Sequence, residues 1–163
     1  MSQSGTSWGQ ARARQIASMR LTCEILGHIL RNVSAEDARA LRDGPDGWSI
    51  IEIVCHLRDF DEIFQSRARM MLELDHPQLP AYDHEALAIE RQYQADSLDD
   101  AYNALKGSRA RFAAFFEALT PAEWARGGVH PERDSFSMTD ALMQVSAHDL
   151  DHLEQITRVM AQA

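Results

Sequence analysis

Four long stretches of helical periodicity limit what this chain can fold into. In each stretch apolar residues recur every three or four positions, and no segment alternates apolar and polar residues as a half-buried strand does. The stretches cover about residues 8–31, 50–74, 98–119 and 138–160. Since each helix would present one apolar face that needs a partner, the pattern predicts an all-α protein, a four-helix bundle.

Polar residues mark where two of the helices begin. Ser49 and Glu52 have the spacing of a capping box, and Ser137 and Asp140 have the same spacing with aspartate in place of glutamate. In a capping box the serine hydroxyl and the acidic side chain satisfy backbone N–H groups of the first turn. We therefore expect helices to start directly after each serine.

The links after the second and third helices are long. The first covers about residues 75–97 and is expected to hold a short helix over about residues 83–93. The second contains the pairs Gly127-Gly128 and His130-Pro131. Links of this length exceed the usual connections in helical bundles, and we expect both to cover one end of the bundle.

Composition excludes several classes of partner. The 163 residues carry a net charge of −9 and one lysine, whereas a nucleic-acid surface or an anionic membrane attracts clustered cations. No stretch approaches the ~18 apolar residues of a membrane span, and the N-terminal residues contain no apolar secretory region. We therefore expect a cytoplasmic protein that binds neither nucleic acid nor membrane. Cys23 and Cys55 are expected as reduced thiols in or near the core.

The seven histidines differ in where the helical pattern places them. His28 lies opposite the apolar stripe of the first helix, so we expect it at the surface. His76 and His84 fall in the first long link, where solvation is expected. His130 precedes the fourth helix and, with Tyr82, is a candidate for the rim of a binding pocket.

His148 and His152 stand four positions apart on the fourth helix, so their side chains share one face. That face is the apolar one, and two inward imidazoles need polar partners. A divalent cation such as zinc satisfies both at once, whereas a pair of hydrogen-bonded core histidines is the alternative. A third ligand would come from another helix. His56, on the flank of the second helix's stripe, is the best candidate, although alone it could be a boundary histidine paired with a carboxylate.

Two charged residues also lie near apolar stripes. Asp149 points inward on the fourth helix, and we expect it to accept the second N–H of a ligand histidine, as metal sites usually require. Arg109 lies near the stripe of the third helix. We expect its aliphatic stem to pack there while its guanidinium reaches the surface.

Two strings of the sequence resemble the DinB-like superfamily, which includes the YfiT-like metal-dependent hydrolases. The first is Gly47-Trp48-Ser49-Ile-Ile-Glu-Ile-Val-Cys-His56-Leu57, and the second is His148-Asp149-Leu-Asp-His152-Leu-Glu-Gln155-Ile156. The resemblance extends from the first helix to the fourth. It is carried by a Trp-Ser pair, a histidine seven residues after that serine, and a late pair of histidines followed by Gln-Ile.

The resemblance implies a single DinB-like bundle domain over residues 1–163 with a long crossover. It also implies a divalent metal, usually zinc or nickel, held by His56, His148 and His152 with open positions for water or substrate. Relatives often form homodimers. Some act as transferases or isomerases that use low-molecular-weight thiols such as bacillithiol or mycothiol.

Three functions are consistent with these residues. The first is a metal-dependent hydrolase that acts on a small-molecule substrate, since three histidines leave an ion with open positions. The second is a thiol-dependent S-transferase or isomerase that uses the same site. The third is a non-catalytic helical binding protein, in which the histidines form a structural hydrogen-bond network.

Overall fold

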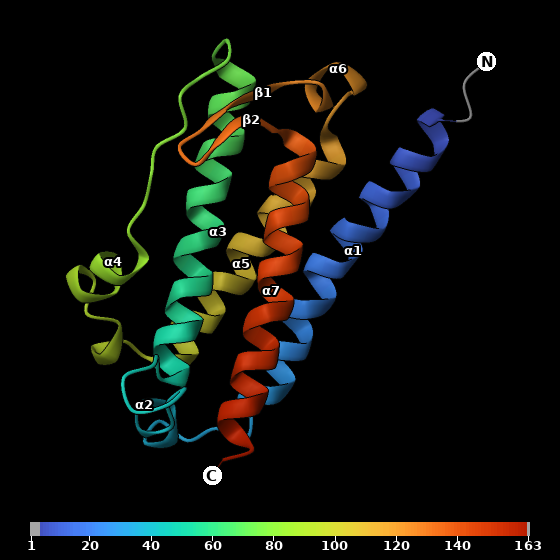
Figure 1. Ribbon diagram of the computed structural model, residues 1–163. Helices are drawn as coiled ribbons and strands as arrows, with labels where there is room; N and C mark the ends of the chain where they lie inside the picture. The colour runs from blue at the N-terminus through green and yellow to red at the C-terminus, as the bar shows by residue number, and fades with distance from the viewer. Residues whose placement is uncertain (1–3, 163) are drawn as a thin grey trace.

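Four long helices make up most of the fold (Figure 1). The structure is a computed structural model that describes residues 4–162. The long helices are α1 (Ser4–Leu30), α3 (Ile50–Glu73), α5 (Leu98–Ala118) and α7 (Met138–Met160). The shorter elements are α2 (Asp37–Ala40), α4 (His84–Glu90), the 3-10 helix η1 (Tyr93–Ala95), α6 (Pro121–Trp124), β1 (Gly127–His130) and β2 (Arg133–Ser137). The four predicted helical stretches are therefore confirmed to within a few residues.

Both predicted capping boxes are present. The Ser49 hydroxyl accepts from the backbone N–H of Glu52, whose carboxylate accepts from the backbone N–H of Ser49 at 2.8 Å. Ser137 and Asp140 form the same arrangement at the start of α7, again at 2.8 Å. Each box satisfies two N–H groups that a first helical turn leaves without partners. The two helices that carry the candidate ligands therefore begin at well-defined residues.

The four long helices form a ring in the order α1, α5, α3, α7, because α1 and α3 each pack against both α5 and α7. Figure 1 shows α1 and α7 running down the view and α3 and α5 running up it. Since α3 and α5 are parallel neighbours, the link between them must return along the bundle. This is the long crossover that the family resemblance implied, and it carries α4 and η1 along the outside of α3.

A small antiparallel hairpin before α7 was not predicted. Its strands β1 and β2 place Gly128 opposite Phe136. Tertiary contacts fix it, because Leu79 of the crossover donates its N–H to the Val129 carbonyl and Val129 donates to the Pro77 carbonyl, each at 2.9 Å. A Cβ atom on Gly128 would lie 2.7 Å from the Pro77 oxygen, so this close approach requires glycine. The strands are only four and five residues long, so the sequence shows no clear alternation of apolar and polar residues that would predict them.

A layer of buried polar residues divides the core into two apolar clusters. The cluster near the hairpin includes Phe64 and Phe112, and the cluster near the C-terminal end of α7 includes Leu26 and Ile53. At the boundary each long helix contributes at least one buried polar side chain: Thr22, Asp61, Ser108, Arg109 and Asp149. On α7, His148 lies between the last residue of the cluster near the hairpin and the first residue of the other cluster. The candidate ligands therefore lie at the level of the polar layer.

Both cysteines lie in the described part of the chain, and Cys23 and Cys55 are free and buried, as predicted. In residues 4–162, no helix combines the length and apolar character that crossing a membrane demands.

Candidate metal centre

Three imidazole nitrogens converge between α3 and α7. Nε2 of His148 lies 2.9 Å from Nε2 of His56 and 3.1 Å from Nε2 of His152. One ligand atom from each residue lies within 4.8 Å of the other two, and over residues 4–162 no fourth His, Cys, Asp or Glu joins them. The fold thus brings together the three histidines that were predicted as ligands.

Hydrogen bonds among the three rings cannot satisfy this cluster. A neutral imidazole nitrogen carries either one proton or one lone pair, so Nε2 of His148 cannot make a full hydrogen bond to both neighbours. A divalent ion can accept all three lone pairs. Two nitrogens bound to one ion at about 2.1 Å lie roughly 3.0–3.4 Å apart for angles of about 90–109°. The observed spacings fall close to this range, so the donor set fits an ion such as zinc.

Aromatic rings form one wall of the cluster. The His148 ring stacks on Phe60, with ring centroids 3.6 Å apart and planes inclined by 6°. The Trp48 ring centroid lies 4.7 Å from that of His56, and His56 is buried. An apolar wall limits solvent access and strengthens the attraction between the nitrogens and a cation.

Gln155 fixes the proton position on His152. Nδ1 of His152 lies 2.7 Å from Oε1 of Gln155, and since an amide oxygen only accepts, Nδ1 carries the proton and Nε2 keeps its lone pair. The amide is itself oriented, because its Nε2 donates to Asp43 at 2.9 Å and Arg158 donates to the same carboxylate. The hydrogen-bond network of Arg158, Asp43 and Gln155 therefore holds His152 in the tautomer that a metal ligand needs. Gln155 was not among the predicted site residues, although its position three residues after His152 on the same helix was an available signal.

Replacing Gln155 with alanine should weaken zinc binding by about 10–100-fold, because His152 loses the acceptor that sets its tautomer and orientation. The measurement is a zinc titration in competition with a chromophoric chelator. Thr157→Ala is the matched control, since this nearby side chain of α7 is exposed and takes no part in the Arg158–Asp43–Gln155 network. If Gln155→Ala binds zinc as tightly as Thr157→Ala does, the amide does not orient the ligand.

Burial lowers the pKa values of the three histidines, because an imidazolium there would lose its hydration beside other imidazoles. The pKa of His56 falls from 6.5 to about 3 and that of His148 to about 2, and the pKa of His152 is also lowered. Between pH 6.5 and about 3 the folded protein therefore binds fewer protons than the unfolded chain does. The contribution of these three histidines to the free energy of unfolding is complete above pH 6.5 and is lost as the pH falls through this range.

In EDTA, the urea midpoint of unfolding should stay level above about pH 7 and decrease between about pH 6.5 and 5, where ordinary carboxylates are still ionised. A variant with His56→Gln and His148→Gln should show a shallower decrease. A wild-type midpoint that does not change between these pH values contradicts the assignment of neutral, buried imidazoles.

His84 was expected to be solvated, and this expectation is wrong. It is the first residue of α4 and is half-buried, and its ring centroid lies 4.9 Å from that of His56 and 6.0 Å from that of Phe60. Its Nδ1 is buried without a hydrogen-bond partner. Helical spacing could not give this contact, because it depends on the path of the crossover. The three histidines therefore lie beside the crossover.

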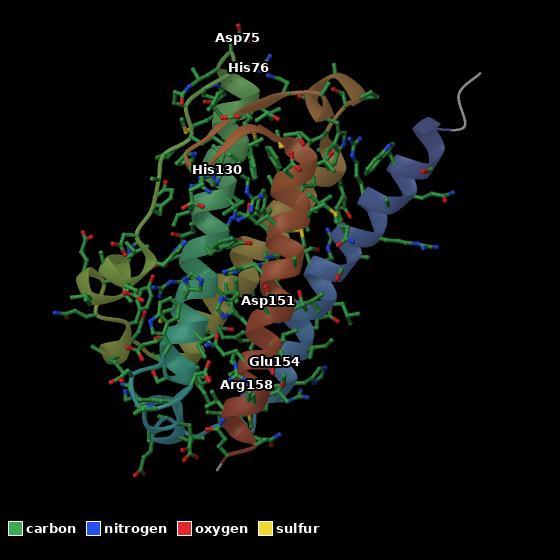
Figure 2. All side chains as sticks on the ribbon, in the orientation of Figure 1. Asp75, His76, His130, Asp151, Glu154 and Arg158 are labelled. Atoms are coloured by element: carbon green, nitrogen blue, oxygen red, sulfur yellow. The ribbon has the colours of Figure 1, made fainter. Side chains whose placement is uncertain are left out.

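His130 and Tyr82 gather around Arg67 and not against the three histidines. His130 is buried, with Nε2 3.3 Å from Nη1 of Arg67, and the Tyr82 ring centroid lies 5.2 Å from Cζ of Arg67. Figure 2 shows His130 on the hairpin, well above Asp151 of α7. Their predicted place on a pocket rim stays a prediction. His28 is exposed, as expected.

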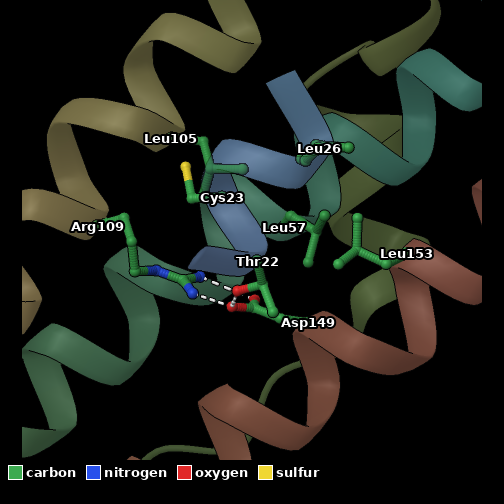
Figure 3. Close-up of a pocket in the computed structure, with 8 residues that line it drawn as sticks. All are labelled: Thr22, Cys23, Leu26, Leu57, Leu105, Arg109, Asp149 and Leu153. Atoms are coloured by element: carbon green, nitrogen blue, oxygen red, sulfur yellow. Dashed lines mark hydrogen bonds and ion pairs between the residues drawn. The ribbon is translucent and has the colours of Figure 1, made fainter. Parts of the chain in front are cut away.

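Asp149 points inward as predicted, but its hydrogen bonds go to residues other than histidine. It accepts from Thr22 at 2.8 Å and from Nη2 of Arg109 at 2.9 Å (Figure 3). Arg109 also donates to Asp61 at 2.7 Å and is 2% exposed, so the expectation that it reaches the surface is wrong. Two buried carboxylates hold its charge in the core. A cavity of about 10 Å³ beside this group has room for about one water molecule.

Comparison with known proteins agrees with this architecture. The family model described as the DinB superfamily matches residues 19–156. A protein of Oceanobacillus iheyensis is 24% identical over 132 residues, which cover 80% of this chain and 75% of that protein. YfiT of Bacillus subtilis is 25% identical over 119 residues, which cover 72% of this chain and 66% of YfiT. Both carry the name "putative metal-dependent hydrolase".

Solved structures show the same fold. The structure of Bacillus subtilis YfiT matches with a TM-score of 0.84 and 21% identity, covering 93% of this chain and 86% of YfiT. A mycothiol-dependent maleylpyruvate isomerase matches with a TM-score of 0.70 and 15% identity, covering 92% of this chain and 68% of the isomerase. At these identities the likeness concerns the arrangement of the helices, and the four-helix bundle is confirmed.

Proposed function

The chain belongs to the DinB superfamily, and from this premise we propose that it is a metal-dependent hydrolase of the YfiT type. His56, His148 and His152 would hold one divalent ion, and zinc or nickel suits three imidazole donors. The substrate would be a small molecule. The names of the curated relatives support the hydrolase assignment for this chain.

One observation carries the proposal. Three Nε2 atoms converge, and in the described part of the chain no fourth protein ligand completes the set. Structural zinc sites are closed by four protein ligands, whereas catalytic sites keep a position open for water or substrate. The same observation argues against the structural hydrogen-bond network, because the three nitrogens cannot satisfy one another.

The chemistry divides between the ion and the protein. When bound, an ion of this kind lowers the pKa of a coordinated water to near 7 and polarises a carbonyl group. The chain orients the ligands through Gln155 and covers one face of the site with Phe60 and Trp48. His84, whose ring lies beside His56 at the crossover, stands where a substrate would meet the protein.

The test is hydrolysis of 4-nitrophenyl acetate by protein reconstituted with zinc or nickel. We expect release of 4-nitrophenol that requires the metal, is abolished by EDTA and returns on metal addition. The rate should be lost in His152→Ala and retained in His28→Ala, since His28 is exposed. A metal-loaded wild type that cleaves neither this ester nor a panel of amides and lactones contradicts the hydrolase assignment.

The thiol-dependent alternative would need a thiol from outside the chain. Burial raises the pKa of Cys23 to about 11 and that of Cys55 to about 12, so neither forms a thiolate near neutral pH. Conjugation of bacillithiol or mycothiol to monochlorobimane, measured with metal-loaded protein, separates this activity from hydrolysis. The homodimer, the cytoplasmic location and the single domain over residues 1–163 stay predictions.

A further inference from the structure

Arg67 is a buried arginine without a carboxylate partner. It is 5% exposed, its Nη2 donates to the Pro80 carbonyl at 2.6 Å, and its Nη1 lies 3.3 Å from Nε2 of His130. Its Nε is buried and has no hydrogen-bond partner. A guanidinium has five N–H donors, so most of its donor capacity is unused. Across the described residues no Asp or Glu forms an ion pair with it.

The other buried arginine shows what such a charge ordinarily requires. Arg109 pairs with both Asp61 and Asp149, and although desolvation opposes them, these charges raise its pKa. The pKa of Arg67 is lowered instead, because desolvation by burial outweighs the favourable interactions with Tyr82 and Glu132. A buried cation without a counter-charge is costly, and ionisable groups perturbed in this way cluster at functional sites.

Arg67 lies on the same side of α3 as His56, about 16 Å further along the helix axis. It follows His56 by eleven residues on α3, which is about three turns and about 20° around the helix. Long side chains on a helix lean toward its N-terminus, which here means toward His56. The positive charge of Arg67 also acts on His84, whose ring lies beside that of His56. His84 therefore lies beside the histidine cluster, and Arg67 adds a cationic group further along the same side of α3.

We propose that Arg67 binds an oxyanion group of the substrate, a carboxylate or a phosphate, while the bond to be cleaved lies at the three histidines. This inference rests on the proposed hydrolase function and names its substrate class. Tyr82 and Pro80 of the crossover would form the cover of this anion subsite. The contrasting role is purely structural, in which Arg67 only anchors the crossover through the Pro80 carbonyl.

Binding of simple anions tests the subsite without catalysis. Isothermal titration with succinate, inorganic phosphate and neutral succinamide is carried out on zinc-loaded and on EDTA-treated protein. Arg67→Gln removes the charge, Arg67→Lys keeps it, and Arg69→Gln is the matched control because Arg69 is exposed on the same helix. We expect succinate or phosphate to bind about tenfold or more weakly to Arg67→Gln than to wild type or Arg69→Gln. Succinamide should not distinguish the variants, and Arg67→Lys should be intermediate.

The anion that shows this dependence identifies the group as carboxylate or phosphate. Equal affinity of wild type and Arg67→Gln for both anions overturns the subsite, and so does a loss of thermal stability in Arg67→Gln without a change in anion affinity. Hydrolysis gives a separate result. Zinc-loaded wild type should prefer 4-nitrophenyl hemisuccinate or 4-nitrophenyl phosphate over 4-nitrophenyl acetate, and Arg67→Gln should lose that preference. If neither these three esters nor the panel of amides and lactones is cleaved, the hydrolase proposal fails while the binding result still decides the role of Arg67.

Discussion

Replacing His148 with alanine is expected to abolish stoichiometric metal binding and, with it, metal-dependent hydrolysis. His148 is the central ligand, because its Nε2 lies 2.9 Å from that of His56 and 3.1 Å from that of His152. Loss of a residue that only supports a ligand weakens metal binding by about 10–100-fold, so loss of a direct ligand should have a larger effect. Two histidines with no further protein ligand cannot replace it.

The measurement is the metal content per chain by mass spectrometry after zinc reconstitution and dialysis. His28→Ala serves as the control, since it removes an exposed histidine of α1. Alanine at position 148 also removes the ring that stacks on Phe60, so circular dichroism must show that the variant is folded. His152 does not stack on Phe60, so His152→Ala should give the same loss of metal without removing that contact. Full zinc occupancy in both variants contradicts the ligand assignment.

The second large effect concerns stability, and it follows from Arg109. Arg109→Ala should lower the free energy of unfolding by about 3–5 kcal/mol, because Asp61 and Asp149 are left buried without their counter-charge. A domain of this kind is stable by only about 5–15 kcal/mol, so the variant should be close to unfolding at ambient temperature. The layer of buried polar residues between the two apolar clusters would then be the least stable part of the variant.

Urea denaturation at neutral pH measures this effect. Arg20→Ala is the matched control, since Arg20 pairs with Glu117 at the surface with both side chains about half-exposed, and such pairs contribute about 0–1 kcal/mol. The two substitutions remove the same side chain from helical positions. If their effects on the free energy of unfolding agree within about 1 kcal/mol, the buried ion pairs do not hold the bundle together.

The sequence could predict features that depend on spacing within one element. The capping serines placed the starts of α3 and α7, and the four-residue spacing of His148 and His152 placed both on one face. His56 was less secure, since its position on the flank of the apolar stripe allowed other partners. The family resemblance, and not helical geometry, made it the third ligand.

Features that depend on contacts between distant segments could not be predicted in this way. Asp149 was correctly placed inward, but its partner Arg109 lies 40 residues away on α5. His84 reaches His56 only because the crossover returns along the outside of α3. The hairpin is likewise fixed by Pro77 and Leu79 of the crossover. In each case the missing information was the path of the chain between helices.

The central claim is that the three histidines hold one catalytic ion. Anomalous diffraction at the zinc edge, from crystals of the reconstituted protein, tests it most directly. The predicted result is one strong peak about 2.0–2.1 Å from Nε2 of each of His56, His148 and His152, with at least one position not filled by protein. A peak at other residues, or zinc-soaked crystals in which the three imidazoles surround only water, would contradict it.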